Sequence, residues 1–127
     1  MAKQERALSL AARSQPVTAN FAGTWNHSTM TLAVTGNMLS GIYTSEVSGA
    51  HKKTQGTLTG YVNGDLIAFS VRWEESASIT AWVGHLVVEN GTEAIETLWQ
   101  MTTQTPSAEE PNELWQSVFA GSDRFTR

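Results

Sequence analysis

Five tryptophans are the residues of this chain best suited to ligand chemistry: Trp25, Trp73, Trp82, Trp99 and Trp115. Each of them begins or ends a short segment in which apolar and polar residues alternate, which is typical of β-strands. Indole is the largest apolar side chain and carries one polar group, the N–H. Tryptophans on several strands of a small sheet can line one cavity. Their number and spacing therefore predict a deep, aromatic-walled hole for a small organic ligand rather than a surface for a polymer.

Side chains that perform catalysis or bind metals form no recognisable set. The three histidines are scattered, without a second ligand at metal-binding spacing: His27, His51 and His85. The acidic pairs at 74–75 and 109–110 fall in predicted loops, where we interpret them as solvated. The sequence contains no cysteine, phosphate-binding glycine loop or nucleophile elbow. An enzyme using His27 and Asp123 as general acid and base is one alternative, but no nucleophile or metal set accompanies this pair. We predict binding without catalysis, cofactor or metal.

The composition fits a single globular domain without polyanionic partners. The chain has 127 residues, 8 basic and 12 acidic, for a formal net charge of -4. Nucleic acids and anionic membranes require a basic footprint, so both are disfavoured as partners. No apolar run approaches the ~20 residues that span a bilayer. Because cysteine is absent, the fold does not rest on disulfides, and the redox compartment stays open.

The first residues differ in composition from the rest of the chain. Residues 1–19 are polar and rich in small residues, and we interpret them as a loose extension with one fraying helical turn over 5–12. The predicted barrel domain covers 20–127. The start is basic, but Arg13 interrupts it and no apolar stretch has the length of a signal peptide. We expect a cytoplasmic protein, or a secreted or periplasmic one if a signal has been removed.

Alternation of period two dominates from Phe21 onward and predicts an all-β fold. Three runs share one face each: Ile67, Phe69, Val71 and Trp73; Thr80, Trp82, Gly84, Leu86 and Val88; Ile95, Thr97, Trp99 and Met101. Turn signals separate such runs: Gly36-Asn37, Ser48-Gly49, Asn63-Gly64, Glu75-Ser76 and Asn90-Gly91. The two Asn-Gly dipeptides favour positive φ at both central positions of a tight hairpin.

The spacing of these turns, roughly a dozen residues, indicates about eight strands in a meander. Eight antiparallel strands in sequence order can close into an up-and-down barrel, which removes the exposed sheet edges. A barrel of this size is wide enough inside for one small ligand. One face of each strand then lines the interior, and the other meets solvent or a partner subunit.

A series of short motifs between Phe21 and Arg127 resembles the avidin and streptavidin family of biotin-binding proteins. In order they are Gly23-Thr24-Trp25, Ser28-Thr29-Met30, Gly41-Ile42-Tyr43-Thr44-Ser45, Leu58-Thr59-Gly60-Tyr61, Phe69-Ser70-Val71-Arg72-Trp73, Ser78-Ile79-Thr80-Ala81-Trp82-Val83-Gly84, Thr97-Leu98-Trp99, Leu114-Trp115-Gln116-Ser117-Val118 and Gly121-Ser122-Asp123-Arg124-Phe125-Thr126. The resemblance implies an eight-stranded antiparallel barrel, high-affinity biotin binding without catalysis, and a homo-oligomer, expected to be a tetramer.

The resemblance assigns five polar residues to the urea group of biotin. Tyr43, Ser28 and Asn26 would donate to the ureido oxygen, whereas Ser45 and Asp123 would accept from the two ureido nitrogens. This division suits the chemistry, because a urea has one acceptor oxygen and two N–H donors, and a carboxylate can only accept. Hydrogen bonds to charged groups are worth ~1.5–3 kcal/mol each, more than neutral ones.

Further contacts follow from the same resemblance. Thr80 would lie near the thioether sulfur and Ser78 at the valerate carboxylate, with backbone groups around Gly49 and Ala50 at the same end. Apolar contacts are implied for Val47 at a lid position, for Trp73, Trp82 and Trp99 as walls, for Met101 where the family usually has leucine, and for Trp115 from a neighbouring subunit. Trp25 lies outside this set, and we interpret it as a plug at the closed end of the barrel.

The first hairpin departs from the family pattern. Only Asn26 and His27 separate Trp25 from Ser28, so the turn is shorter than the family usually has, and part of one wall is missing. His27 either replaces a missing donor or lies at the rim. A second hypothesis therefore keeps the barrel but gives it weakened biotin affinity or a different small-molecule ligand.

Overall fold

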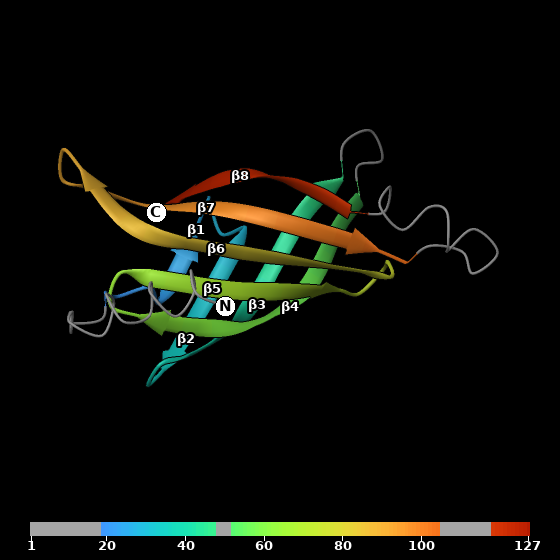
Figure 1. Cartoon of the computed structure of the whole chain (residues 1–127), viewed down its shortest axis with the longest axis horizontal. Helices are drawn as coiled ribbons and strands as arrows, with labels where there is room; N and C mark the ends of the chain where they lie inside the picture. The colour runs from blue at the N-terminus through green and yellow to red at the C-terminus, as the bar shows by residue number, and fades with distance from the viewer. Residues whose placement is uncertain (1–18, 48–51, 105–117) are drawn as a thin grey trace, which may run out of the picture.

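The computed structural model describes residues 19–47, 52–104 and 118–127. These residues form one sheet of eight strands: β1 (Gly23–Trp25), β2 (Met30–Thr35), β3 (Met38–Val47), β4 (Lys52–Asn63), β5 (Leu66–Trp73), β6 (Ser78–Glu89), β7 (Thr92–Thr103) and β8 (Val118–Thr126). Strands adjacent in sequence are adjacent in the sheet, and every pair is antiparallel. The sheet curls so that β5, β6 and β7 cross in front of β2, β3 and β4 (Figure 1). The predicted all-β, eight-stranded up-and-down barrel is confirmed.

The extension predicted over residues 1–19 lies almost entirely outside the described residues and stays a prediction. Ala19 is the first described residue, and its amide donates to the carbonyl of Gly64 at 2.8 Å. Within the part of the chain that the structure describes, no helix is long and apolar enough to cross a membrane.

The hairpin turns confirm one Asn-Gly prediction and correct the other. Between β6 and β7, Asn90 and Gly91 both have positive φ, 52° and 78°, as predicted. Between β4 and β5 the central residues are instead Gly64 and Asp65, because Asn63 pairs with Leu66 as the last residue of β4. Only Gly64 has positive φ there, 62°. Glycine at the first central position is the pattern of a type II′ hairpin, which fits the strand twist equally well.

Alternation places the predicted faces inside the barrel. Along β5, Ile67, Phe69 and Val71 are buried, and along β6 the same is true of Thr80 and Trp82. The predicted inward faces are confirmed over this part of β5 and β6, whereas Val88, near the end of β6, is 63% exposed. The largest fully buried side chains include Trp25, Phe21, Phe125, Met30, Leu39, Leu58 and Ile95.

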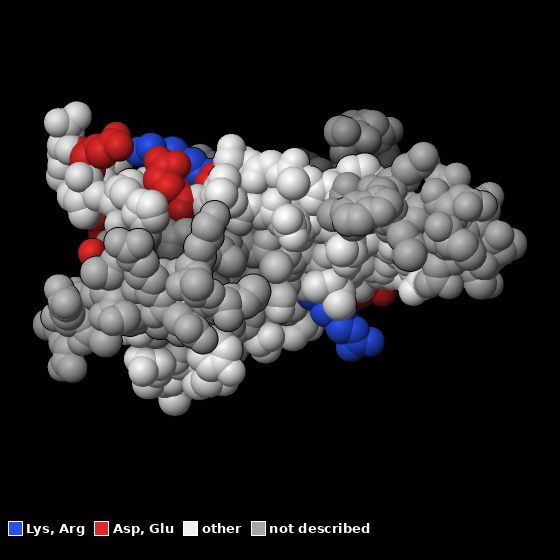
Figure 2. All heavy atoms as spheres, in the orientation of Figure 1, with Lys and Arg blue, Asp and Glu red and all other residues white. Residues whose placement is uncertain are grey.

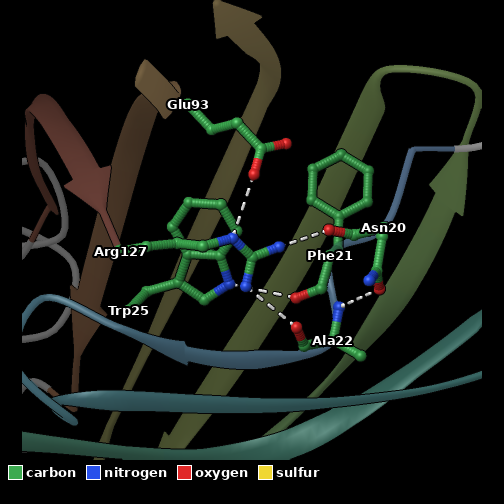
Figure 3. Close-up of polar contacts among 6 residues, drawn as sticks. All are labelled: Asn20, Phe21, Ala22, Trp25, Glu93 and Arg127. Atoms are coloured by element: carbon green, nitrogen blue, oxygen red, sulfur yellow. Dashed lines mark hydrogen bonds and ion pairs between the residues drawn. The ribbon is translucent and has the colours of Figure 1, made fainter. Parts of the chain in front are cut away.

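One end of the barrel is closed around Trp25 by the side chain of Arg127 (Figure 3). Trp25 is completely buried, and the Arg127 guanidinium lies 4.1 Å from the centre of its ring. The same guanidinium donates to the carbonyls of Asn20 at 2.5 Å and Ala22 at 3.0 Å. It also pairs with Glu93 on β7 at 3.2 Å. Arg127 thus ties the segment before β1 to the start of β7 and covers the buried indole.

Candidate functional site

A cluster of five aromatic rings occupies the interior. Trp82 on β6 is stacked between Phe69 on β5 and Tyr43 on β3, with ring centroids at 5.0 and 5.1 Å and interplanar angles of 19° and 17°. Tyr43 also meets the edges of Trp73, at 5.6 Å, and of Phe125 on β8, at 6.1 Å. Such stacked and edge-on pairs add about 0.5–1.5 kcal/mol each beyond burial. Because side chains alternate between the two faces of a strand, β3, β5, β6 and β8 each direct their aromatic residues to the same inner face.

The indole N–H groups of this cluster fix two polar residues. Trp82 Nε1 donates to Asp123 Oδ2 and Trp73 Nε1 donates to Thr80 Oγ1, both at 2.9 Å. The Thr97 hydroxyl holds the backbone carbonyl of Asp123 at 3.0 Å. Among the described residues no donor reaches Asp123 Oδ1. The half-buried carboxylate is therefore oriented by Trp82 and Thr97, and within the described ranges its Oδ1 accepts no hydrogen bond.

Burial, and after it the negative charge of Asp123, raises the pKa of Tyr43 to about 12. Both causes disfavour the phenolate, so the hydroxyl keeps its proton and can donate a hydrogen bond at any physiological pH. The Tyr43 hydroxyl and the Asp123 carboxylate are thus a fixed donor and a fixed acceptor beside the same indole. This pair can recognise a small planar group that itself carries both an acceptor and a donor.

The Tyr43 pKa predicts a loss of stability at alkaline pH. The unfolded phenol titrates near 10.0 and the folded one near 12, so the folded state holds its proton more tightly. This contribution is complete below pH 10 and is lost as the pH rises through 12. We expect the wild type to lose about 1–2 kcal/mol more than Tyr43→Phe across this range, allowing for the partial exposure of the ring. Urea unfolding at pH 9 and pH 11.5 measures it, and equal losses in both proteins contradict the assignment.

The two predicted serine contacts lie at the edge of the cluster. The Thr29 carbonyl accepts from the Thr44 amide at 2.8 Å, which places the turn residue Ser28 beside the part of β3 that carries Tyr43 and Ser45. Ser28 is exposed and Ser45 is half-buried. Ser45 lies two residues after Tyr43 on the same strand, and the ligand contacts of both serines stay predictions.

Asn26 lies at the junction of β1 and β8, and its side-chain amide contacts residues of β8 rather than Tyr43. Its Oδ1 accepts from the Thr126 amide at 2.9 Å, and its Nδ2 lies 3.5 Å from the Arg124 carbonyl. Both ends of the amide are therefore used by the protein itself.

Three other predicted residues line the inner face of β6 and β7 and are half-buried. Trp99 pairs with Trp82 on one side and with Gly121 on the other. A Cβ at Gly121 would lie 2.6 Å from Trp99 Cζ2, so only glycine leaves room for this indole. Met101 pairs with Thr80, and Ser78 begins β6 with its hydroxyl bonded to that of Ser76 at 2.7 Å. These three side chains are therefore more accessible than Thr80 and Trp82 on the same inner face.

Some predicted residues fall outside what the structure describes. Gly49, Ala50 and Trp115 lie in the undescribed segments, and Val47 ends β3 without a described side chain. Their proposed ligand contacts stay predictions.

The enzymatic alternative gains no contact that would support it. His27 is an exposed turn residue, and none of the hydrogen bonds of Asp123 among the described residues involves it. In the described ranges, no group of three or more His, Cys, Asp or Glu residues is arranged to hold a metal ion.

Sequence reasoning did not single out Phe69 and Phe125 as part of the site. Both are buried, and each contacts Trp82 and the other directly. Their positions in the alternating pattern could have identified them. Phe69 shares the face of Trp73, and Phe125 lies two residues from Asp123 on the same strand. They support the site by holding the Trp82 ring.

Comparison with known proteins places this geometry in a recognised group. A model of the avidin family matches residues 15–127. The crystal structure of xenavidin is similar with a TM-score of 0.72 and 25% identity, covering 86% of this chain and 97% of that one. The structure of a rhizavidin–biotin complex is similar with a TM-score of 0.66 and 28% identity, covering 83% and 97%. Apo shwanavidin gives a TM-score of 0.60 at 26% identity, covering 76% and 86%. A search of curated proteins found no match.

Proposed function

Because this chain belongs to the avidin family, we propose that it binds biotin at one site per chain and catalyses no reaction. The observation that carries the proposal is the Tyr43–Trp82–Asp123 arrangement, in which a protonated hydroxyl and a carboxylate flank one indole. The rhizavidin structure, which resembles this one, was determined with biotin bound.

In the proposed complex, the urea of biotin lies between fixed donors and a fixed acceptor. The hydroxyls of Tyr43 and Ser28 donate to the ureido oxygen, and Asp123 Oδ1 and the Ser45 hydroxyl accept from the nitrogens. Opposite polarities at the two ends of a urea reinforce each other, and a poorly solvated interior strengthens such hydrogen bonds. Trp73, Trp82 and Trp99 cover the apolar rings, with Thr80 near the sulfur. Because the barrel is preorganised, little ordering entropy is lost on binding.

The affinity depends on the short first hairpin. Because Asn26 Oδ1 accepts from the Thr126 amide and its Nδ2 faces the Arg124 carbonyl, we propose that the side-chain amide is oriented toward β8 and makes no hydrogen bond with the ureido oxygen. One missing neutral hydrogen bond corresponds to about 0.5–1.5 kcal/mol, or roughly two- to twelvefold in affinity. The second candidate function, a barrel with weaker biotin binding or another small-molecule ligand, is favoured by this one observation.

A fluorescence titration distinguishes these two functions. Trp73, Trp82 and Trp99 would all change environment on biotin binding, so intrinsic tryptophan emission should shift and saturate at one biotin per chain. Desthiobiotin, which keeps the urea but lacks the sulfur, should produce the same shift. If tens of micromolar protein show no change with either compound, biotin is not the ligand and the alternative gains support.

The outer face of the sheet supports the proposed homotetramer. Register aligns Met38, Tyr61, Ala68, Val83 and Leu98 in one row across β3 to β7. The four large members are exposed by 53 to 71%. In Figure 2, the charged atoms of this view gather toward the ends, and the described atoms over the middle of β6 and β7 are uncharged. An exposed apolar band with charged margins is typical of a protein–protein contact. We propose that a second copy of the chain covers it.

Leu98→Lys tests this contact. A lysine at the centre of a buried apolar interface leaves an unpaired charge, which is costly. We expect the assembly to fall from about four chains to smaller species by light scattering at micromolar concentration. Gln100→Lys, one outward position further along β7, is the matched control and should leave the assembly unchanged. A monomeric wild type contradicts the proposal.

Trp115 is proposed to complete a neighbour's site. If it does, Trp115→Lys should increase the biotin off-rate, because loss of a desolvating aromatic anchor acts mainly on dissociation. The measurement is competitive release of labelled biotin from the wild type, Trp115→Lys and Leu98→Lys. If the assembled wild type and Trp115→Lys release biotin at the same rate, the site is completed within one chain.

A further inference from the structure

The two edge strands of the sheet, β1 and β8, meet without a ladder of paired residues. In the described part of the chain, β1 pairs with β2 and β8 pairs with β7. Asn26, the residue directly after β1, makes three hydrogen-bond contacts with β8. Its amide N–H donates to the Thr126 carbonyl at 2.6 Å, its Oδ1 accepts from the Thr126 amide at 2.9 Å, and its Nδ2 faces the Arg124 carbonyl at 3.5 Å. Arg127, directly after β8, separately covers Trp25 and donates to the Ala22 carbonyl.

The short hairpin explains how Asn26 reaches β8. Asn26, His27 and Ser28 have consecutive positive φ values of 51°, 54° and 69°. Left-handed backbone is unfavourable for most residues, and asparagine tolerates it best among those with a side chain. This left-handed turn reverses the chain directly after Trp25, so β1 is only three residues long. A side-chain amide has the same donor and acceptor as a peptide group, so Asn26 supplies the hydrogen bonds that the next strand residue would have made.

The segment of β8 that Asn26 contacts also carries Asp123, the proposed ligand acceptor. Asp123 precedes Arg124 directly, and its carbonyl and carboxylate are held from the other side by Thr97 and Trp82. The strand is thus fixed between β7 on one edge and Asn26 on the other. Without the Asn26 side chain, the amide of half-buried Thr126 would lose its acceptor and the carbonyl of exposed Arg124 would lose its nearby donor, which leaves this stretch of β8 less firmly held on its β1 side.

We propose that Asn26 is a positioning residue that closes the barrel between β1 and β8 and thereby fixes Asp123, and that its amide is not a ligand of the urea. The closing role stands on the contacts above, and only the effect on Asp123 as a ligand rests on the proposed biotin function.

Hydrogen exchange in the ligand-free protein tests the closing role. In Asn26→Ala, the Thr126 amide loses its acceptor, so its exchange measured by NMR should accelerate by about tenfold or more. Asn90→Ala is the matched control, because Asn90 is also a turn asparagine with a positive φ of 52° and makes none of the three contacts with Thr126 and Arg124. It should leave Thr126 exchange unchanged. Unchanged Thr126 exchange in Asn26→Ala overturns the proposal, whether or not the protein binds biotin.

A double-mutant cycle tests whether Asn26 acts through Asp123 or contacts the urea itself. If Asn26 only positions Asp123, Asn26→Ala should weaken biotin binding in the wild type but by no more than about twofold in the Asp123→Ala background, where no carboxylate is left to position. If Asn26 donates to the ureido oxygen, Asn26→Ala should weaken binding by the same factor in both backgrounds. Equal losses overturn the proposal, and a wild type without biotin binding refutes the proposed function while leaving the exchange result valid.

Discussion

Asp123→Ala is expected to weaken biotin binding by about 10- to 150-fold, which corresponds to one hydrogen bond to a charged group, ~1.5–3 kcal/mol. The carboxylate is already oriented by Trp82 and Thr97, so Oδ1, which no donor among the described residues reaches, can accept a ureido N–H without reorganisation. Removing it also leaves the Trp82 N–H without its partner. Ser78→Ala, which removes a neutral hydroxyl at the start of β6, should cost only about two- to twelvefold.

Asp123→Asn separates the charge from the shape. An asparagine oxygen can still accept from Trp82 Nε1, but its amide would then present N–H groups to the ureido N–H. We expect this variant to fold like the wild type and to lose as much affinity as Asp123→Ala. Dissociation constants from competition with labelled biotin measure the three variants. Equal losses for Asp123→Ala and Ser78→Ala would contradict the roles assigned to these two residues.

Trp82→Ala is expected to destabilise the fold by about 3–5 kcal/mol, the usual cost of truncating a buried aromatic residue to alanine. Trp82 is 4% exposed, lies between Phe69 and Tyr43, and bonds Asp123. The substitution would leave a cavity and would remove the stacking contacts of the indole with both Phe69 and Tyr43. For a domain of this size, the change lowers Tm by roughly 10–20 °C.

Two comparisons make the Trp82 prediction specific. Trp82→Phe keeps a ring in the stack and loses the N–H, so it should be milder than Trp82→Ala and should still weaken biotin binding through Asp123. Trp73→Ala removes a half-buried indole that contacts Tyr43 only at its edge, so it should cost less stability. Thermal unfolding without ligand orders the three proteins. If Trp73→Ala is the least stable, the centre of the aromatic cluster is not Trp82.

The barrel and the inner faces of β5, β6 and β7 could be predicted from the sequence because burial repeats every second residue there. The apolar residues Ile67, Phe69 and Val71 show which alternate positions of β5 face the interior. The same alternation decides which tryptophans face inward. The turn at Asn90 was predictable because Asn-Gly selects its backbone conformation. At Asn63 the same dipeptide failed, since cross-strand pairing with Leu66 overrode the local preference.

The site contacts were less predictable, because they depend on register between strands far apart in sequence. No local pattern indicates that Trp82 reaches Asp123, or that Phe125 meets Tyr43, across so much intervening chain. Asn26 shows the limit most clearly. Its position after Trp25 favoured a ligand donor by resemblance, whereas the shortened hairpin turns its amide toward β8. A side chain that substitutes for backbone pairing has no signature in the sequence.

The most direct test of the central claim is an isothermal titration of the purified protein with biotin. If Tyr43, Trp82 and Asp123 form a urea site inside the barrel, heat should be released with a stoichiometry of one biotin per chain, and Asp123→Asn should reduce the affinity by at least about tenfold. The absence of binding heat at any temperature tried, or a wild-type affinity that Asp123→Asn leaves unchanged, would contradict this account.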